Sequence, residues 1–333
     1  MAALRTLLHV VAMWTAGYLA AIKATVRRLL LGPTLPSWSW RTEWTVAALR
    51  AVIGTAVKHR DDTNLQRLGI RARTPVPARL RSRVMVRRSR LGSTVADRAV
   101  PRHGNSGFTL LYFHGGGYVF GNPGIHRQFI AQLVAATGAT AIAPVYRLAP
   151  HNKFPAAVDD AEEAYEAVLR SGVSSDRIVV GGDSAGGGLA LALLLRLRER
   201  GRPLPAGAVL LSPYTDLDHR SYTVVANART DYLPVEVMSL PNDFYADDDL
   251  RAHPEASPAN ADLTGLPPLL ILAGGAEMLL GDSLELERHA NRDGVSVELF
   301  VEPEMVHVWP IVVGWEPASQ RALDAIDRWL ATL

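Results

Sequence analysis

Residues 177–200 read RIVVGGDSAGGGLALALLLRLRER, and this stretch decides the fold of the chain. An apolar run, 178–181, is followed at once by GDSAG at 182–186 and then by an apolar segment, 187–200, with the composition of a helix. A strand, a tight turn and a helix in this order place a serine on a strained turn, with its hydroxyl pointing away from the sheet. We therefore predict that Ser184 is a nucleophile at the end of a parallel strand.

Apolar runs and helical segments alternate along the chain from residue 108. The other runs with strand character are Phe108–His114, Thr140–Tyr146, Gly207–Leu211, Pro268–Ala273 and Val295–Val301, and helices are expected at 127–137, 156–171, 283–293 and 317–330. Several runs are apolar on both faces, as the strands of a sheet covered by helices on both sides must be. The alternation predicts an α/β fold with a mostly parallel central sheet. Residues 214–265 break it with prolines and acids, and we predict that they form an insertion.

A serine hydroxyl needs a base, and an acid that orients the base, before it can attack a carbonyl carbon. With this kind of elbow, the acid and the histidine follow the nucleophile in that order. His307 lies in the loop after the predicted strand 295–301, and we predict that it is the base. The acid should follow the strand 268–273, where Glu277 and Asp282 are the candidates. We favour Glu277, which comes just after the strand, because Asp282 is placed to cap the following helix.

Negative charge that develops on the carbonyl oxygen of a substrate must be stabilised by hydrogen-bond donors. The run HGGG at 114–117 follows the first predicted strand and offers backbone N–H groups without side chains in the way. We predict that the N–H groups of Gly115, Gly116 and Ala185 form an oxyanion hole. A phosphate-binding loop is the rival interpretation, but neither a Lys-Ser/Thr pair nor a G-x-G-x-x-G pattern accompanies these glycines.

Four motifs together resemble the bacterial hormone-sensitive-lipase family of α/β-hydrolases. They are HGGGY at 114–118, YRLAP at 146–150, FPAA at 154–157 and GDSAGG at 182–187, and the resemblance extends from about residue 75 to the C-terminus. It implies an α/β-hydrolase fold, with helices on both faces of the sheet. It also implies a helical cap built from the N-terminal helices and the insertion at 214–265.

The resemblance implies a carboxylesterase or lipase that cleaves short- to medium-chain acyl esters through an acyl-enzyme intermediate, without a metal or a cofactor. It assigns Ser184, Glu277 and His307 to the triad, with the oxyanion donors named above. Two positions depart from the family pattern: Glu277 stands where aspartate is common in an Asp-Pro-Leu setting, and His151 follows YRLAP where glutamate is usual. The alternatives on the same fold are an amide or carbamate hydrolase and a small-molecule-binding protein that has lost its base.

The composition excludes several other classes of protein. With 333 residues, 48% of them hydrophobic, the chain can bury a large core, and its lack of cysteine excludes thiol nucleophiles, disulfides and zinc–thiolate sites. Residues 1–103 carry 19 Lys and Arg against 4 Asp and Glu, whereas residues 104–333 carry 16 against 29. Nine of the arginines lie between Arg67 and Arg90, and their spacing around Val84–Val86 indicates the exposed face of an edge strand. Because no aromatic residues are interleaved with them, we expect no nucleic-acid partner.

The N-terminal segment allows three interpretations. Between Arg5 and Lys23 lie seventeen uncharged, mostly apolar residues, at the lower limit for a helix that spans a membrane. The segment is a helix over the cleft with its apolar side buried by the body, a peripheral membrane contact through residues 1–31, or a cleaved signal peptide. We divide the chain into a cap segment, 1–75, and a catalytic domain, 76–333, and expect a cytoplasmic protein that can associate with a membrane. The sequence leaves the oligomeric state open.

Tryptophans are concentrated in this front section, at Trp14, Trp38, Trp40 and Trp44. We expect them to belong to an apolar lid that lines an acyl pocket and keeps it dry.

Overall fold

The computed structural model describes residues 2–60 and 72–333, so Arg67 and Arg71 of the arginine run lie outside the described residues. Its helices are α1 (Ala2–Leu31), α2 (Trp40–Lys58), α4 (Ala78–Arg81), α5 (Arg127–Thr137), α6 (Ala156–Arg170), α7 (Ala185–Glu199), α8 (Thr223–Ala226), α9 (Ser239–Phe244), α10 (Leu280–Arg292), α11 (Trp309–Val312) and α12 (Pro317–Leu330). Its strands are β1 (Val84–Leu91), β2 (Thr94–Pro101), β3 (Thr109–Phe113), β4 (Thr140–Pro144), β5 (Ile178–Asp183), β6 (Gly207–Leu211), β7 (Leu269–Gly274) and β8 (Val297–Glu302). Short 3₁₀ turns lie at Ser175–Arg177, Val235–Met238 and Pro258–Asn260.

The strands form one sheet in the order β1-β2-β4-β3-β5-β6-β7-β8. From β4 to β8 every neighbouring pair is parallel, and β1 and β2 add an antiparallel edge. Strand β5, which ends next to Ser184, lies inside the sheet with β3 and β6 on either side. The predicted α/β-hydrolase fold with a mostly parallel central sheet is therefore confirmed.

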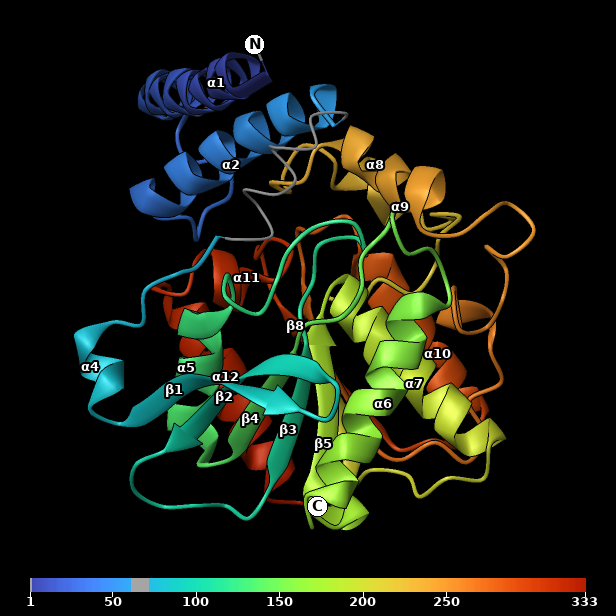
Figure 1. Ribbon diagram of the computed structural model, residues 1–333. Helices are drawn as coiled ribbons and strands as arrows, with labels where there is room; N and C mark the ends of the chain where they lie inside the picture. Colours follow the sequence, from blue (N-terminus) through green and yellow to red (C-terminus); the bar gives the residue numbers. More distant parts are fainter. Residues whose placement is uncertain (1, 61–71) are drawn as a thin grey trace.

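Helices cover both faces of this sheet (Figure 1). Alternate residues of one strand belong to different hydrophobic clusters: Val180 packs in the layer with α6, α7 and α10, and Val179 in the layer with α5 and α12. Side chains on both sides of the strand are buried, which explains why the central strands read as continuous apolar runs.

The antiparallel edge is only partly predicted by the sequence. Strand β1 is the edge strand indicated by the arginine pattern, with Arg87 and Arg88 exposed. Strand β2 is not predicted, because its central residue, Asp97, is charged. The structure buries this carboxylate and pairs it with Arg127 across 2.9 Å. The charged residue of this ion pair interrupts the apolar pattern of β2, so the sequence pattern does not indicate a strand there, although its other inward-facing residues are apolar.

Helices α1 and α2 lie at the end of the molecule where the parallel strands end (top of Figure 1). Helix α2 is attached to the body at its N-terminus, where the indole N–H of Trp38 donates to the carbonyl of Glu304 at 2.6 Å. The hydroxyl of Ser39 donates to the carboxylate of Glu316 at 2.5 Å. Helix α1 packs along α2 rather than directly over the sheet.

The apolar side of α1 is not buried by the body, and this interpretation of the N-terminal segment is wrong. Within Leu4–Leu31, only 6% of the most apolar window is buried. The expected pocket of tryptophans is also wrong: Trp14 is 72% exposed, Trp40 and Trp44 are exposed as well, and only Trp38 is buried. The division of the chain at residue 75 stays a prediction.

Candidate active site

Ser184 is the single residue between β5 and α7, as the strand–turn–helix pattern predicts. Its backbone has φ 53° and ψ −123°, a conformation that costs of order 1–3 kcal/mol for a residue with a side chain. The N–H of Ser184 donates to the carbonyl of Leu211 at 2.9 Å, and its own carbonyl accepts from Gly187 and Tyr214, both at 2.9 Å. Hydrogen bonds to the neighbouring strand therefore hold the turn, and Ser184 itself stays partly exposed.

The glycines of the elbow are required by close backbone contacts. A Cβ on Gly186 would overlap the carbonyl oxygen of Phe113 in β3, and a Cβ on Gly182 would lie 2.5 Å from the same oxygen. Helix α7 thus starts directly against β3, which an alanine at either position would prevent.

The loop after β3 brings the predicted oxyanion donors to the elbow. A Cβ added to Gly115 would lie 3.1 Å from the Cβ of Ser184, and Gly116 has φ +123°. Among the described residues, the backbone N–H groups of Gly115, Gly116 and Ala185 donate no hydrogen bond. Three backbone donors without acceptors therefore lie in the loop and helix start that flank the serine.

Residues of the YRLAP motif form hydrogen bonds with this loop. The hydroxyl of Tyr146 donates to the carbonyl of His114 at 2.7 Å, and the two rings are stacked with centroids 4.3 Å apart. The N–H of Ala149 donates to the carbonyl of Tyr118 at 3.0 Å. Burial lowers the pKa of His114 to about 3, so this imidazole is neutral and acts as part of the scaffold.

Asp183, just before the serine, is turned away from it. Its carboxylate accepts from the hydroxyl of Tyr112 at 2.8 Å and lies 3.1 Å from Nε2 of His126. Burial alone would raise the pKa of Asp183, but the neighbouring His126 lowers it below the ordinary value. The pair is a buried structural contact under the elbow.

His307 and Glu277 lie together in the loops after β8 and β7. Both side chains are buried, and Nδ1 of His307 is 3.6 Å from Oε2 of Glu277. Burial on its own would lower the pKa of His307, but the carboxylate of Glu277 raises it above its ordinary value. Among the described residues, Nε2 of His307 makes no hydrogen bond, one to Ser184 included. Such bonds are often long when no substrate is bound.

Ser212, which the sequence analysis did not single out, binds Glu277 and the residue that follows His307. Its hydroxyl donates to Oε2 of Glu277 at 2.7 Å and accepts from the N–H of Val308 at 3.0 Å. The preceding residue, Leu211, accepts from the N–H of Ser184. The end of β6 therefore links the nucleophile, the acid and the loop of the base. Its signal in the sequence is a serine at the carboxyl end of a buried strand.

Asp231, in the predicted insertion, was also missed. It is fully buried, its Oδ2 accepts from the N–H of Met278 at 2.8 Å, and its Oδ1 lies 3.4 Å from the backbone nitrogen of His307. Burial raises the pKa of Asp231 to about 6, although His307 nearby acts in the opposite direction. The adjacent Thr230 donates to the carbonyl of Ala276 at 2.9 Å, so residues 230 and 231 both form hydrogen bonds with the loop that carries Glu277.

Asp282 does not have the role that we expected for it. Helix α10 begins at Leu280, so Asp282 lies inside the helix and does not cap it. Its carboxylate accepts from the backbone N–H groups of Thr215 and Asp216, at 2.8 and 3.1 Å. Burial raises its pKa to about 7. Of the two candidate acids, Glu277 is the one that the structure places beside His307.

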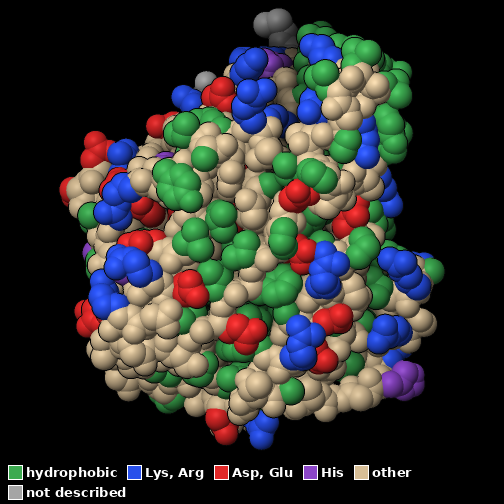
Figure 2. Space-filling model, turned by 180° about the vertical axis from the view of Figure 1, so that it is seen from behind, with side chains coloured by type: hydrophobic (Ala, Val, Ile, Leu, Met, Phe, Trp, Pro, Cys, Tyr) green, Lys and Arg blue, Asp and Glu red, His purple; other side chains and the backbone are tan. Residues whose placement is uncertain are grey.

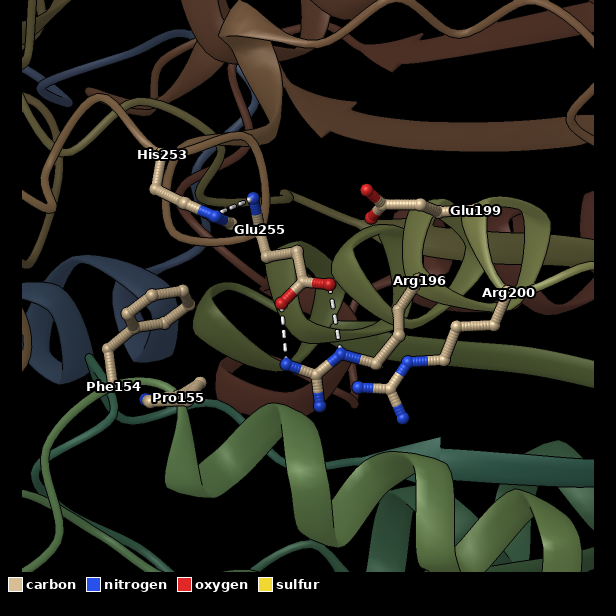
Figure 3. A pocket seen from close by; sticks show the side chains of 7 residues that line it. All are labelled: Phe154, Pro155, Arg196, Glu199, Arg200, His253 and Glu255. Atoms are coloured by element: carbon tan, nitrogen blue, oxygen red, sulfur yellow. Dashed lines mark hydrogen bonds and ion pairs between the residues drawn. The ribbon is translucent and has the colours of Figure 1, made fainter.

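One hollow on the described surface lies away from these residues (Figure 3). Its volume is about 460 Å³, and it is lined by Phe154, Pro155, Arg196, Glu199, Arg200, His253 and Glu255. Arg196 is twelve residues beyond Ser184 along α7, roughly 18 Å at the rise of an α-helix. Its guanidinium donates to both oxygens of Glu255, at 2.9 and 2.5 Å, so these two charges in the hollow are paired with each other.

No group of three or more His, Asp or Glu side chains that could hold a metal ion is present in residues 2–60 and 72–333. The chemistry that these side chains can perform by themselves is nucleophilic: a serine on a strained turn, a buried imidazole with an adjacent carboxylate, and free backbone donors.

Comparison with known proteins agrees with this geometry. The sequence profile of the alpha/beta hydrolase fold family matches residues 110–311. An acetyl-hydrolase of Streptomyces hygroscopicus is 44% identical over 229 residues, which is 68% of this chain and 76% of that protein. An esterase of Acinetobacter venetianus is 32% identical over 226 residues, 67% of this chain and 75% of its own length.

Solved structures give the same result. The hormone-sensitive-lipase homologue EstE7 from a metagenome library is 37% identical, with a TM-score of 0.77 over 86% of this chain and 96% of that one. A crystal structure of EstE5 with PMSF is 33% identical, with a TM-score of 0.74 over 80% of this chain and 89% of that one.

Proposed function

Since the chain belongs to the bacterial hormone-sensitive-lipase family of α/β-hydrolases, we propose that it is a carboxylesterase in which Ser184, His307 and Glu277 form the catalytic triad. The observation that carries these roles is the link through β6. Its last residue binds the backbone of Ser184, and the next residue, Ser212, binds both Glu277 and the residue after His307. Three loops that are far apart in the sequence are thereby held in one place.

The reaction follows from these positions. Nε2 of His307 takes the proton of the Ser184 hydroxyl as the oxygen attacks the carbonyl carbon of the ester. The carboxylate of Glu277, near Nδ1, stabilises the imidazolium that results. The developing oxyanion accepts hydrogen bonds from the free N–H groups of Gly115, Gly116 and Ala185. His307 gives its proton to the leaving alcohol, and then activates the water that releases the acid from the serine.

The substrate class is an ester with a short to medium acyl chain. Two relatives support it: the Streptomyces protein is an acetyl-hydrolase, and a crystal of EstE5 was soaked with p-nitrophenyl butyrate. PMSF, present in another EstE5 crystal, is a reagent that sulfonylates activated serines. The non-catalytic alternative on this fold requires loss of the base, and His307 is present.

The test is hydrolysis of p-nitrophenyl esters with acyl chains from two to sixteen carbons, by the wild type and by Ser184→Ala. We expect activity with a maximum among the shorter chains, and a loss on the order of 10⁶-fold in kcat for the variant. A folded wild-type protein without activity on any ester, or a Ser184→Ala variant that keeps its activity, would refute the assignment. Anilide and carbamate analogues of the best ester test the alternative hydrolase activities.

We also propose a cytoplasmic location with a peripheral membrane contact through residues 1–31. The charge of the segment supports it, because residues 1–31 contain four Lys and Arg residues and no acid. The cytoplasmic leaflet carries the anionic lipids that attract such segments.

A further inference from the structure

Helix α1 buries small and polar side chains and exposes large apolar ones, the reverse of what is usual for a helix in water. The fully buried side chains on the face toward α2 are small or polar: Thr6 and Ala24 are buried there, and a Cβ on Gly17 would lie only 2.9 Å from a methyl group of Val52. In a soluble amphipathic helix, the large apolar side chains would occupy this buried face. Small residues at a close helix contact are typical of helices packed in lipid.

The large apolar side chains of α1 lie on the opposite face. They recur every three or four residues at Leu4, Leu8, Val11, Trp14, Tyr18 and Ile22, which we call the outer stripe. Each is between 43% and 72% exposed. Figure 2 shows hydrophobic side chains gathered at the top right, where α1 lies. An exposed apolar surface of this length marks a site of interaction, because scattered single residues would not align along one helix face.

The charges of the segment point to an anionic lipid surface as its occupant. Residues 1–42 contain Arg5, Lys23, Arg27, Arg28 and Arg41 and no acidic residue. Arg5 and Lys23 are exposed on α1 itself. Glu43 of α2 pairs with Arg27 and Arg28, at 3.0 and 2.8 Å, so the cations left to meet a partner of α1 are Arg5 and Lys23. A second copy of this chain packed on α1 would bring these two cations against one another. Anionic headgroups would neutralise them, and the stripe carries a Trp and a Tyr, the residues that favour the membrane interface.

The contacts with α2 hold α1 along the surface of the molecule, so that it does not project away from the body. The rings of His9 and His59 are stacked with centroids 3.8 Å apart, and the indole of Trp44 donates to Thr25 at 2.9 Å. These two contacts lie toward opposite ends of α1, so it runs antiparallel along α2. Helix α1 is long and apolar enough to cross a membrane, with a mean hydropathy of 1.4 within Leu4–Leu31. It could not cross one while it keeps both contacts, because α2 is fixed to the body.

The hairpin also has a defined orientation relative to the proposed active site. Trp38, two residues before α2, donates to the carbonyl of Glu304, three residues before His307. Helix α1 therefore covers the same end of the molecule as the loops of the triad (Figure 1). We propose that the outer stripe of α1 inserts into the surface of an anionic lipid bilayer and holds this end of the enzyme against the membrane. The orienting role rests on the proposed function, since it delivers esters dissolved in the bilayer to Ser184.

The test is flotation of the full chain with vesicles of phosphatidylcholine alone or mixed with phosphatidylglycerol. We expect the wild type to float with the mixed vesicles at low salt and much less with phosphatidylcholine. The variant Trp14→Asp/Tyr18→Asp should lose binding by roughly tenfold or more, because two charges enter the stripe. The matched control, Met85→Asp/Val95→Asp, places the same charges on exposed apolar positions of β1 and β2 and should bind like the wild type.

Measurements of esterase activity test the membrane contact independently of the proposed esterase function. The stripe variant should hydrolyse soluble p-nitrophenyl acetate like the wild type, which also shows that it is folded, and should lose activity on a long-chain ester embedded in the mixed vesicles. A wild type that stays out of the floating fraction refutes the membrane contact, whatever its esterase activity. The membrane contact is also refuted if the wild type sediments as a dimer and the Trp14→Asp/Tyr18→Asp variant sediments as a monomer, because the outer stripe would then be a dimer interface. Flotation without any esterase activity would leave the membrane contact standing and refute the proposed function.

Discussion

One oxygen of the buried Asp231 lies 3.4 Å from the backbone nitrogen of His307, and the other accepts from the N–H of Met278 at 2.8 Å. Because Met278 follows Glu277, a single carboxylate joins the loops of the proposed base and the proposed acid. Asp231 comes from the insertion after β6. The insertion therefore helps to set the geometry of the triad.

The charge of Asp231 should be visible in the pH dependence of activity. Burial lowers the pKa of His307, but the carboxylates of Glu277 and Asp231 outweigh it and raise the pKa above 6.5. The base must be neutral to accept a proton, so activity should rise with pH, with a midpoint above 6.5 in the wild type. Asp231→Asn removes one of the carboxylates, and the midpoint should move to lower pH.

The measurement is kcat/KM from about pH 5 to about pH 9 for both proteins. Since burial raises the pKa of Asp231 itself to about 6, its charge is lost below that pH, and the two profiles should differ most above it. A uniform loss of activity with an unchanged midpoint would show that Asp231 is only a structural contact.

The choice between the two candidate acids gives a sharper comparison. Glu277→Gln leaves the shape of the side chain but removes the charge beside His307, and kcat should fall by roughly 10³- to 10⁴-fold. Asp282→Asn changes a carboxylate that binds backbone N–H groups of Thr215 and Asp216, so kcat should stay within a few-fold of the wild type. Equal losses in the two variants, or a larger loss for Asp282→Asn, would contradict the assignment of Glu277.

The parts of this site that were predictable have local signals. Ser184, His307 and the glycines of 115 and 116 each follow a strand whose apolar run can be read directly, and the order of the loops is set by the fold. Ser212 and Asp231 act through contacts with residues more than 40 positions away, which no local pattern encodes. The same reason explains the failure for Asp282: a carboxylate near a helix start resembles a cap until its partners are known.

For the N-terminal helix, the sequence predicts the helix but not which of its sides is buried. An apolar composition indicates a helix, but the side that is buried depends on the partner against which it packs. In α1 the partner, α2, meets the small residues and leaves the large ones outside, which reverses the usual relation between hydrophobicity and burial.

Ser212 offers a test of the link between the three loops. Ser212→Ala leaves the N–H of Val308 and Oε2 of Glu277 without this partner, so the free energy of unfolding should fall by about 1.5–3 kcal/mol and kcat should fall as well. Ser283→Ala is the matched control, because the hydroxyl of Ser283 is equally buried and has no partner among the described residues. Chemical denaturation and kcat for both variants check this. Similar effects of the two substitutions would mean that burial, and not the hydrogen bonds of Ser212, causes the loss.

The packing of α1 on α2 can be tested with two glycines. Gly54, inside α2, has room for a methyl group, since an added Cβ would lie 3.9 Å from the nearest atoms of Pro234. Gly54→Ala should therefore stabilise the hairpin by about 0.5–1 kcal/mol through helix propensity. At Gly17 the same gain is opposed by the contact of 2.9 Å with the stiff side chain of Val52. Amide hydrogen exchange along α1 should become slower in Gly54→Ala and faster, or unchanged, in Gly17→Ala. Slower exchange in Gly17→Ala, as large as that in Gly54→Ala, would show that α1 does not lie against α2 in solution, and the flat orientation proposed for it would then have no support.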